Sequence, residues 1–378
     1  MNSSKTHERT GSRSAARPRA NFQRLKFTGG NDFQMELRRR VERYLEETGR
    51  SQRDCPRMYL KSGVILSVFA ASYVLLVGVV SVWWLAVPLA ILLGLSAAAI
   101  GFNIMHDAGH KAYSKSAFVN RLMSAMVEVI GGSGYVWHWK HGVFHHTYVN
   151  ITGYDTDINM GGLARLSPHQ KRLIFHRWQH WYVWFLYGLM AIKWELYDDF
   201  RDVILGRMDG HRFPRPRGRD LLIFLAGKAG FFALAFGVPL LFHPLWVVAV
   251  FYGVAVVVLG VVLSLVFQLA HCVEEAHFPL PDEPGKMEAS WGIHQVETTV
   301  NFARRNRAVS WLLGGLNFQI EHHLFSRICH VNYPAISRLV EETCREFGIR
   351  YNVHDSVFSG LRSHFRWLRK MGRAPVPA

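Results

Sequence analysis

The stretch from Trp83 to His110 reads WWLAVPLAILLGLSAAAIGFNIMHDAGH, an apolar run that leads into two histidines. The run as far as Ile104 carries no charge and reaches the roughly 20 residues that a helix needs to cross a bilayer core. His106 follows two residues later, and its spacing of four residues from His110 would place both imidazoles on one helix face. The stretch therefore predicts a spanning helix that brings two candidate metal ligands to the membrane surface.

Three other runs have the length and apolar character of a membrane span, and 49% of the 378 residues are apolar. These runs are Ser62–Val82, Leu221–Phe242, which contains Lys228, and Pro244–Ala270. A large soluble helical protein with buried helices is the alternative, but four such runs in one chain disfavour it. We expect an all-α integral membrane protein with four transmembrane helices in two hairpins and a cytosolic helical cap that holds a histidine-rich site.

The net charge of +16 comes from basic residues that flank the apolar runs. Residues 1–61, Arg201–Arg219 and Arg362–Arg373 are rich in Lys and Arg, as the positive-inside rule expects of cytosolic segments. This placement disfavours a nucleic-acid-binding role. No signal peptide is visible in the polar start of the chain, so we expect the N-terminus, the C-terminus and the histidine clusters on the cytosolic side.

Outside the spans, apolar periodicity predicts helices in the cap or on the membrane surface. Asp32–Thr48 and Pro334–Gly348 each show an amphipathic pattern with a terminating glycine. Arg121–Ile130 and Trp178–Leu196 are ambiguous and are interpreted as helices that lie on the membrane or in the cap. The expected parts of the chain are a disordered basic tail (1–31), a cytosolic amphipathic helix (32–61), a membrane domain (62–350) and a basic C-terminal tail (351–378).

Further histidines add to the two candidate ligands of the opening stretch, and His141 and His145 repeat their spacing of four residues. They are His141, His145 and His146, then His271 at the end of the fourth run, and His322 and His323, with Gln319 one turn before the last pair. Together with the first two, they are more ligands than one metal ion can use, and they suit two ions. Imidazole binds iron, copper, zinc and nickel, so the ligand type alone does not name the metal. The four cysteines are scattered and are expected as free thiols.

Missing motifs and the positions of the histidines narrow the possible classes of metal site. The H-E-x-x-H motif of zinc peptidases and the paired E-x-x-H motifs of soluble di-iron bundles are missing from the sequence. A bis-histidine haem protein would need histidines that face each other within the membrane, and a metal transporter would need them along a path through the bilayer. No histidine stands in the middle of an apolar run. An all-histidine pair of irons at the membrane surface is the remaining interpretation.

Several residues near the histidine clusters are weaker candidates for a role in the metal site. Asp155, Asp157 and Asn150 follow the second cluster and either orient ligand histidines or cap a loop. Glu274 and Glu275 follow the fourth run and are expected mainly as solvated charges.

The remaining histidines lack partners at ligand spacing. His294 is the one further candidate ligand, although a structural role is favoured, and His138 and His277 are out of register with the clusters. The others are expected at the membrane interface beside Trp and Arg: His169, His176, His180, His211, His243, His330, His354 and His364.

Three motifs resemble the histidine boxes of membrane-bound fatty acid desaturases: HDAGH from His106, HGVFHHTYVN from His141 and QIEHHLF from Gln319. The glutamine that opens the third motif is similar to that of front-end desaturases and their bacterial acyl-lipid or acyl-CoA relatives. The similarity runs from about Phe33 to Arg350.

This resemblance implies a non-haem di-iron enzyme that uses O₂ and two electrons to remove two hydrogens from adjacent methylenes of an acyl chain. The implied iron ligands are His106, His110, His141, His145, His146, His322 and His323, with His271 as the family's extra histidine and Gln319 as an uncertain ligand. A hydroxylase, ketolase or acetylenase on the same scaffold is the alternative.

One difference from the family pattern concerns the electron donor. Eukaryotic front-end desaturases often carry a fused cytochrome b5 domain with an HPGG motif, which is missing here. Electrons are therefore expected from a separate donor, such as a ferredoxin or a cytochrome b5, and the basic cytosolic surface suits an acidic partner. The other implied partners are a fatty acyl lipid or acyl-CoA and the lipids of a bacterial inner membrane. Ser326 replaces a proline common in bacterial relatives, a loop change of little consequence.

Overall fold

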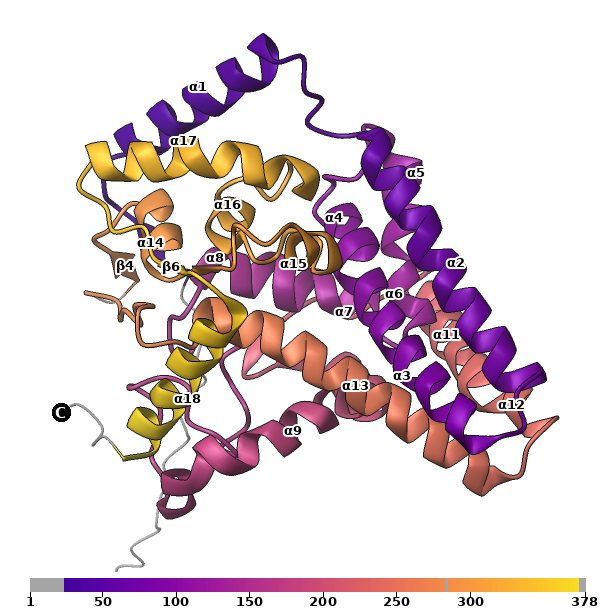
Figure 1. The fold of residues 1–378 in the computed structure, drawn as a ribbon. Coiled ribbons are helices and arrows are strands. Elements are labelled where there is room, and N and C mark those ends of the chain that lie inside the picture. The colour runs from indigo at the N-terminus through magenta and orange to yellow at the C-terminus, as the bar shows by residue number, and fades with distance from the viewer. Residues whose placement is uncertain (1–23, 283–284, 374–378) are drawn as a thin grey trace, which may run out of the picture.

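The computed structural model describes residues 24–282 and 285–373, and most of the predicted N-terminal tail lies outside these ranges. Helices dominate the described chain (Figure 1). Its strands form three short pairs: β1 (Lys26–Phe27) with β4 (Lys286–Met287), β2 (Arg207–Met208) with β3 (His211–Arg212), and β5 (Asn301–Phe302) with β6 (Val353–His354). The predicted helical membrane fold is confirmed.

Four helices are long and apolar enough to cross a membrane, and they coincide with the four predicted runs. They are α2 (Pro56–Gly78), α3 (Trp83–Ile100) continued by η1 (Gly101–Met105) and α4 (His106–Gly109), α11 (Arg219–Phe232) continued by η5 (Ala233–Gly237) and α12 (Val238–Leu240), and α13 (Leu245–His271). The second and fourth helices extend further than predicted, so His106 and His271 lie on them and not just beyond their ends. Much of the apolar surface of all four is exposed, as expected of helices that face lipid.

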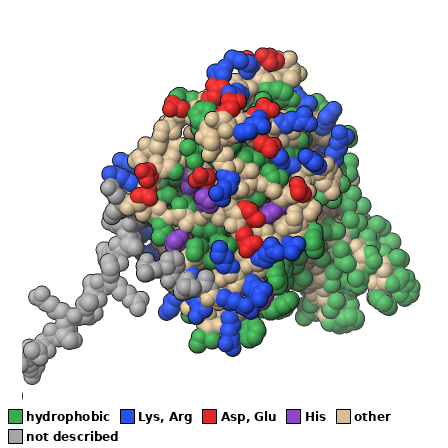
Figure 2. Space-filling model, turned by 60° about the vertical axis from the view of Figure 1, so that its left-hand side comes forward, with side chains coloured by type: hydrophobic (Ala, Val, Ile, Leu, Met, Phe, Trp, Pro, Cys, Tyr) green, Lys and Arg blue, Asp and Glu red, His purple; other side chains and the backbone are tan. Residues whose placement is uncertain are grey.

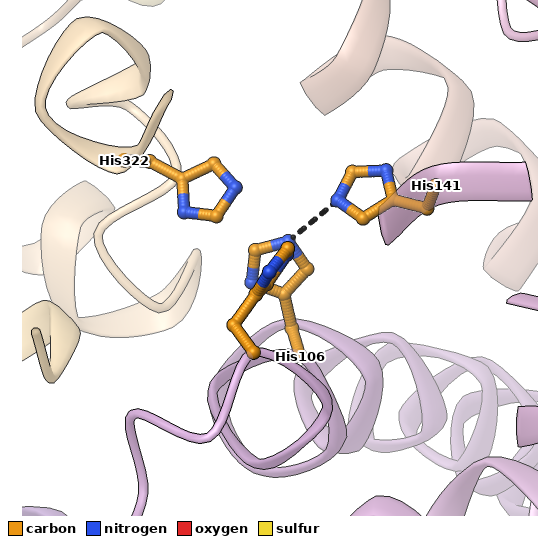
Figure 3. A group of neighbouring side chains, drawn as sticks. His106, His141 and His322 are labelled. Atoms are coloured by element: carbon orange, nitrogen blue, oxygen red, sulfur yellow. Dashed lines mark hydrogen bonds between the residues drawn. The ribbon is translucent and has the colours of Figure 1, made fainter. Parts of the chain in front are cut away.

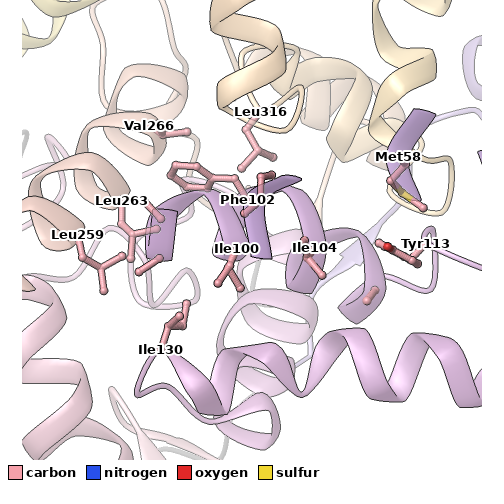
Figure 4. Packing of buried hydrophobic residues seen from close by; sticks show 14 of the residues in the cluster. Met58, Ile100, Phe102, Ile104, Tyr113, Ile130, Leu259, Leu263, Val266 and Leu316 are labelled. Atoms are coloured by element: carbon pink, nitrogen blue, oxygen red, sulfur yellow. The ribbon is translucent and has the colours of Figure 1, made fainter. Parts of the chain in front are cut away.

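Small residues let the second and fourth spans approach each other closely. A Cβ atom at Gly94 of α3 would lie 2.4 Å from the carbonyl oxygen of Ala255 on α13. The largest hydrophobic cluster continues from this crossing, and Figure 4 shows Phe102 and Leu263 within it. Inside a bilayer the hydrophobic effect does not drive helices together, so close packing of this kind is what holds them in contact. The two helices that carry His106 and His271 are thereby fixed against each other.

The charge within the third span is accommodated by buried partners. The ammonium of Lys228 forms an ion pair with Asp199 at 2.8 Å and donates a hydrogen bond to the carbonyl oxygen of Gly131 at 2.7 Å. A buried charge is tolerated when it is paired and hydrogen-bonded. Because Asp199 belongs to the segment between the hairpins, the pair also ties that segment to the bundle.

Short helices fill the segment between the hairpins. α5 (Ala117–Ser124) and α6 (Met126–Val129) form the first ambiguous segment, and α9 (Gln179–Lys193) forms most of the second. α9 packs along α13, where a Cβ atom at Gly260 would lie 2.6 Å from the carbonyl oxygen of Tyr187. The other helices here are α7 (Gly134–Trp137), η2 (His138–His145), α8 (His146–Tyr148), η3 (Ile174–Trp178), η4 (Trp194–Asp198) and α10 (Asp199–Leu205).

The cap is built around the two predicted amphipathic helices, α1 (Asp32–Glu47) and α17 (Tyr333–Glu346), which lie side by side in Figure 1. Phe33, Leu37 and Val41 of α1 are buried in a cluster with residues of α17. The remaining cap elements are α14 (Trp291–Glu297), α15 (Arg307–Leu312), α16 (Gln319–Leu324), η6 (His330–Asn332) and α18 (Val357–Arg373).

The expectation of a basic tail after residue 350 requires a correction. Within this range α18 is an amphipathic helix that buries Trp367, Leu368 and Met371 in a cluster with Val183 and Tyr187 of α9. The high density of Arg residues in the sequence obscures this apolar periodicity. The basic residues project from the opposite face of a packed helix.

Candidate metal centre

The first two histidines follow a local change in helical winding. η1 is a π-helical turn inserted between α3 and α4, and such turns are frequent at functional sites. His106 is buried at the start of α4, and His110 is half-buried at its end. The centroids of their rings lie 4.8 Å apart. The predicted pairing of these two side chains on one helix face is confirmed.

The second box is also wound as a π-helix. η2 ends at His145, and His146 begins α8. In an α-helix His146 would point about 100° away from its neighbour, but the i→i+5 winding places it about one turn after His141. The Nε2 atoms of His141 and His146 lie 3.2 Å apart. The winding thus turns all three histidines of this box toward one centre.

All eight predicted histidines come together from distant parts of the chain. Figure 3 shows His106, His141 and His322 converging from different elements. The ring nitrogens form two main groups within ligand distance, namely His106, His110, His141 and His322, and His145, His271 and His323. His146 lies beside His322 and His323, between these groups. Two linked groups of donors suit two metal ions.

The hydrogen bonds of the rings test whether the cluster fits a metal. Buried polar atoms are normally paired, yet this cluster contains buried ring nitrogens without a hydrogen-bond partner in the described chain. They are Nε2 of His110, His145 and His323, and both nitrogens of His271, whereas Nδ1 of His141 lies 3.5 Å from a carboxylate oxygen of Asp157. Metal ions would satisfy such convergent nitrogens, and imidazole donors suit iron as well as zinc or copper. The residues therefore fit the ions that the histidine boxes imply.

Acceptors from neighbouring loops fix the orientation of two rings. Nδ1 of His145 lies 3.1 Å from a carboxylate oxygen of Asp155, and Nδ1 of His323 lies 2.9 Å from Oε1 of Gln295. A ring that donates through one nitrogen presents the lone pair of the other nitrogen to a metal. Asp157 lies farther away, 3.7 Å from the same nitrogen of His145. The orienting role considered for Asp155 is thus supported by its contact.

Asn150 joins the second box to the end of the fourth span. Its side-chain amide donates hydrogen bonds to the carbonyl oxygens of His271, His277 and Thr298 at 3.0, 3.1 and 3.1 Å. Its backbone N–H donates to Asp155 at 2.8 Å, and its φ of 58° lies in the left-handed region that Asn tolerates. One asparagine therefore sets the position of His271 relative to the second box.

Burial favours the neutral form of the imidazoles. Burial, followed by the neighbouring histidines, lowers the pKa of His141, His146 and His322 well below the usual value of 6.5. Burial also opposes the charged form of His145, but Asp155 raises the pKa of that ring above its usual value. Because metals bind the neutral imidazole, these low pKa values keep most of the cluster ready for a cation at neutral pH.

Other candidates lie outside the ligand groups. The backbone N–H of Glu274 donates to the hydroxyl of Ser363 of α18, which in turn donates to the carboxylate of Glu275. His294 is buried with an unpartnered Nε2 atom, but it belongs to none of the ligand groups. Gln319 is buried as well, and neither polar atom of its amide has a hydrogen-bond partner in the described ranges.

Six of the histidines expected beside Trp and Arg at the membrane interface are buried within the protein: His176, His180, His211, His330, His354 and His364. His364 illustrates the reason. Its Nδ1 donates to the carbonyl oxygen of Cys272 at 2.6 Å, and its Nε2 accepts from the hydroxyl of Tyr187 at 2.7 Å. Partners this far away in the sequence cannot be recognised from spacing. All four cysteines are free, as expected.

Two side chains that make polar contacts with ligand histidines were not predicted. The hydroxyl of Tyr333 lies 3.3 Å from Nδ1 of His322, and Gln295 contacts His323 as described above. Neither residue type is a usual metal ligand, and both come from elements outside the boxes. The one available signal was that Gln295 directly follows His294 in the WGIHQ motif.

Comparison with known proteins agrees with this geometry. A family model described as fatty acid desaturase matches residues 81–355. The chain belongs to the fatty acid desaturase family. The match begins just before α3 and contains all eight histidines of the centre. This desaturase is therefore an oxidoreductase that introduces double bonds into fatty acyl chains.

The desaturase is similar to curated relatives over most of their length. It is 40% identical to the sn-1 linoleoyl-lipid 6-desaturase of Arthrospira platensis, over 91% of this chain and 93% of the relative. It is 35% identical to the enzyme of the same name from Synechocystis sp., over 93% of this chain and 99% of the relative. It is also 33% identical to the acyl-lipid (8-3)-desaturase of Mortierella alpina, over 91% of this chain and 78% of the relative.

Proposed function

We propose that this desaturase acts on fatty acyl chains of membrane lipids. A linoleoyl chain and the 6 position are the first substrate and product to test, because two relatives that align over nearly their full length are named sn-1 linoleoyl-lipid 6-desaturases. The glutamine that opens QIEHHLF also supports a front-end reaction. An acyl-CoA is the alternative substrate.

Two iron ions are the proposed cofactor, and O₂ is the co-substrate. The proposed ligands are His106, His110, His141, His145, His146, His271, His322 and His323. The observation that carries this assignment is the convergence of buried ring nitrogens that have no hydrogen-bond partner in the described chain. Gln319 is proposed as a neighbour of the metal that binds directly or through water.

Bound iron supplies the O₂-dependent oxidation that acid or base groups cannot perform on an unactivated methylene. The side chains of the desaturase bind the ions and keep water away by burial. Asp155 and Gln295 hold His145 and His323 with one ring nitrogen directed to the centre, so the ligand geometry does not have to form anew on metal binding.

Residues 62–350 are proposed as the desaturase domain, with both termini and the centre on the cytosolic side of a bacterial inner membrane. Two hairpins of spanning helices support this topology, because they return the chain to its starting side. Reporters fused at residue 1 and at residue 378 should both be cytosolic, and opposite locations would contradict the topology. Electrons are proposed to come from a separate ferredoxin or cytochrome b5.

Expression in a heterologous host tests the reaction directly. Gas chromatography with mass spectrometry of the host lipids should reveal a new double bond. It should appear in the membrane lipids before it appears in the acyl-CoA pool. The matched control is the His145→Ala variant at equal expression. A hydroxylated or acetylenic product would instead support the other chemistries of this scaffold, and an unchanged lipid profile with a competent electron donor would contradict the proposed substrate.

A further inference from the structure

A shallow pocket near the start of α9 gathers three arginines. It is lined by Arg172, Arg177, Trp178 and Arg373, with a volume of about 620 Å³, and its lining includes no acidic residue. In the described ranges, none of these arginines forms an ion pair with a carboxylate. Three guanidinium groups that share one pocket without a counter-charge repel one another, so the pocket favours an anion.

The walls of the pocket are held in place by hydrogen bonds. Arg172 donates to the carbonyl oxygen of Arg373 at 3.0 Å, and the guanidinium of Arg177 stacks 4.9 Å from the ring centroid of Trp178. Behind them the buried Arg165 donates to the carbonyl oxygen of Met371 at 2.8 Å, which fixes the end of α18. The fold therefore brings the backbone positions of these three arginines together, and contacts hold the guanidinium groups of Arg172 and Arg177.

A buried titratable group beside the pocket senses this positive field. Burial, and then the charges of Arg373 and Arg369, lower the pKa of His180. This effect is consistent with a local potential that the described side chains do not neutralise.

An exposed apolar stripe leads away from the same pocket. Ile174 and Trp178 of η3 and Trp181 and Phe185 of α9 are 82%, 53%, 65% and 70% exposed, and a spacing of three and four residues places Trp178, Trp181 and Phe185 along one face of α9. Figure 1 shows α9 at the edge of the molecule along α13, and Figure 2 shows Lys and Arg gathered above hydrophobic surface at the lower edge. Exposed Trp and Phe with adjacent arginines are typical of a helix in the interface of a bilayer.

We propose that this pocket binds the phosphate of an anionic membrane lipid, whose acyl chains lie along the exposed stripe of α9. Guanidinium groups bind phosphate oxygens through paired, charge-assisted hydrogen bonds, and the stripe supplies the apolar contact that a soluble anion cannot use. The lipid would hold α9, and through it α13 with His271, at a fixed depth in the membrane. This site is separate from the acyl substrate and does not depend on the proposed reaction.

Native mass spectrometry of the full-length protein in neutral detergent tests the site. The protein is incubated with equal amounts of phosphatidylglycerol and phosphatidylcholine that carry the same acyl chains. Wild type should retain phosphatidylglycerol preferentially. Arg172→Gln with Arg177→Gln should reduce that preference about 25-fold, since each basic residue near an anionic surface contributes roughly fivefold. The matched control, Arg338→Gln with Arg345→Gln on the distant α17, should keep it.

Two results would overturn the proposal. One is an equal preference in wild type and in the Arg172/Arg177 variant. The other is complete displacement of phosphatidylglycerol by inorganic phosphate, which would identify a site for the free anion and not for a lipid. If the double variant does not fold, Arg373→Gln alone applies the same criterion, with an expected loss of about fivefold.

Discussion

Two kinds of buried histidine occur in this desaturase, and they differ in how their second ring nitrogen is used. His176 and His364 have both nitrogens in hydrogen bonds with protein atoms. His145 and His323 use only Nδ1, and their buried Nε2 atoms lack a hydrogen-bond partner in the described structure. A neutral imidazole has one donor and one acceptor, so a ring with both satisfied is complete, whereas the other kind still requires a partner. Burial alone therefore does not distinguish a ligand; a free ring nitrogen that lies within ligand distance of the ring nitrogens of other histidines does.

Removing a ligand should give the largest effect. His323→Ala or His145→Ala should lower product formation by more than about 100-fold, beyond the loss usual for orienting residues, and should reduce bound iron. Iron content by mass spectrometry and product by gas chromatography measure both. The comparison predicts that His176→Ala keeps its iron. Loss of iron from that control to the same extent would show that the two kinds of histidine are not functionally distinct.

Removing an orienting side chain should give the next largest effect. Gln295→Leu deletes the acceptor of His323 and should weaken iron binding or activity about 10- to 100-fold. Gln295→Glu retains an acceptor oxygen and should restore much of the affinity, which a purely structural role would not explain. Iron titration of the apoprotein measures the affinities, and equal values for the two variants would contradict the orienting role.

Removing a fully bonded histidine should change stability and its pH dependence. Burial lowers the pKa of His364 to about 4. Below pH 6.5 the unfolded chain binds a proton that the folded chain does not bind until about pH 4, so stability falls as pH decreases through this window, by at most about 3 kcal/mol. His364→Gln lacks this contribution, and its thermal midpoint should depend less on pH. Parallel pH curves for the two apoproteins would contradict the assignment.

Replacing His294 should have the smallest effect on iron content and activity. It also tests most directly how the two kinds of buried histidine differ. It has an unpartnered Nε2 atom like a ligand but lies outside the ligand groups. His294→Ala should therefore retain two irons per chain and most of the activity. If this variant binds only one iron per chain, His294 is a ligand, and an unpartnered ring nitrogen identifies a ligand even outside the two groups of converging histidines.

The spans and the histidine boxes were predictable because each depends on local properties. Apolar length identifies a membrane helix, and a spacing of four residues places His106 and His110 together whatever the rest of the chain does. The π-helical winding of η1 and η2 could not be predicted, because HWKHGVFHH has the same residue pattern in either winding. For the same reason the alignment of His146 with His141 appeared only in the structure.

Contacts between distant segments of the chain also could not be predicted from the sequence. Gln295 meets His323, and Tyr187 meets His364, through packing of elements that lie far apart in the chain. Glutamine and tyrosine are common residues with many uses, so their type carries little information. The burial of the six other histidines could not be predicted because their partners can come from distant segments, as Asp107 and Lys61 do for His330.

The number of residues in the α-helical span before the first box is a constraint in itself. Inserting or deleting one residue within Trp83–Ile100, where the winding is α-helical, would rotate everything after it by about 100°. His106 and His110 would then turn away from His141, although every histidine would still be present. The lipid-facing apolar residues of this helix can be exchanged for one another, but a larger residue at Gly94 and insertions or deletions between Trp83 and Ile100 should be selected against.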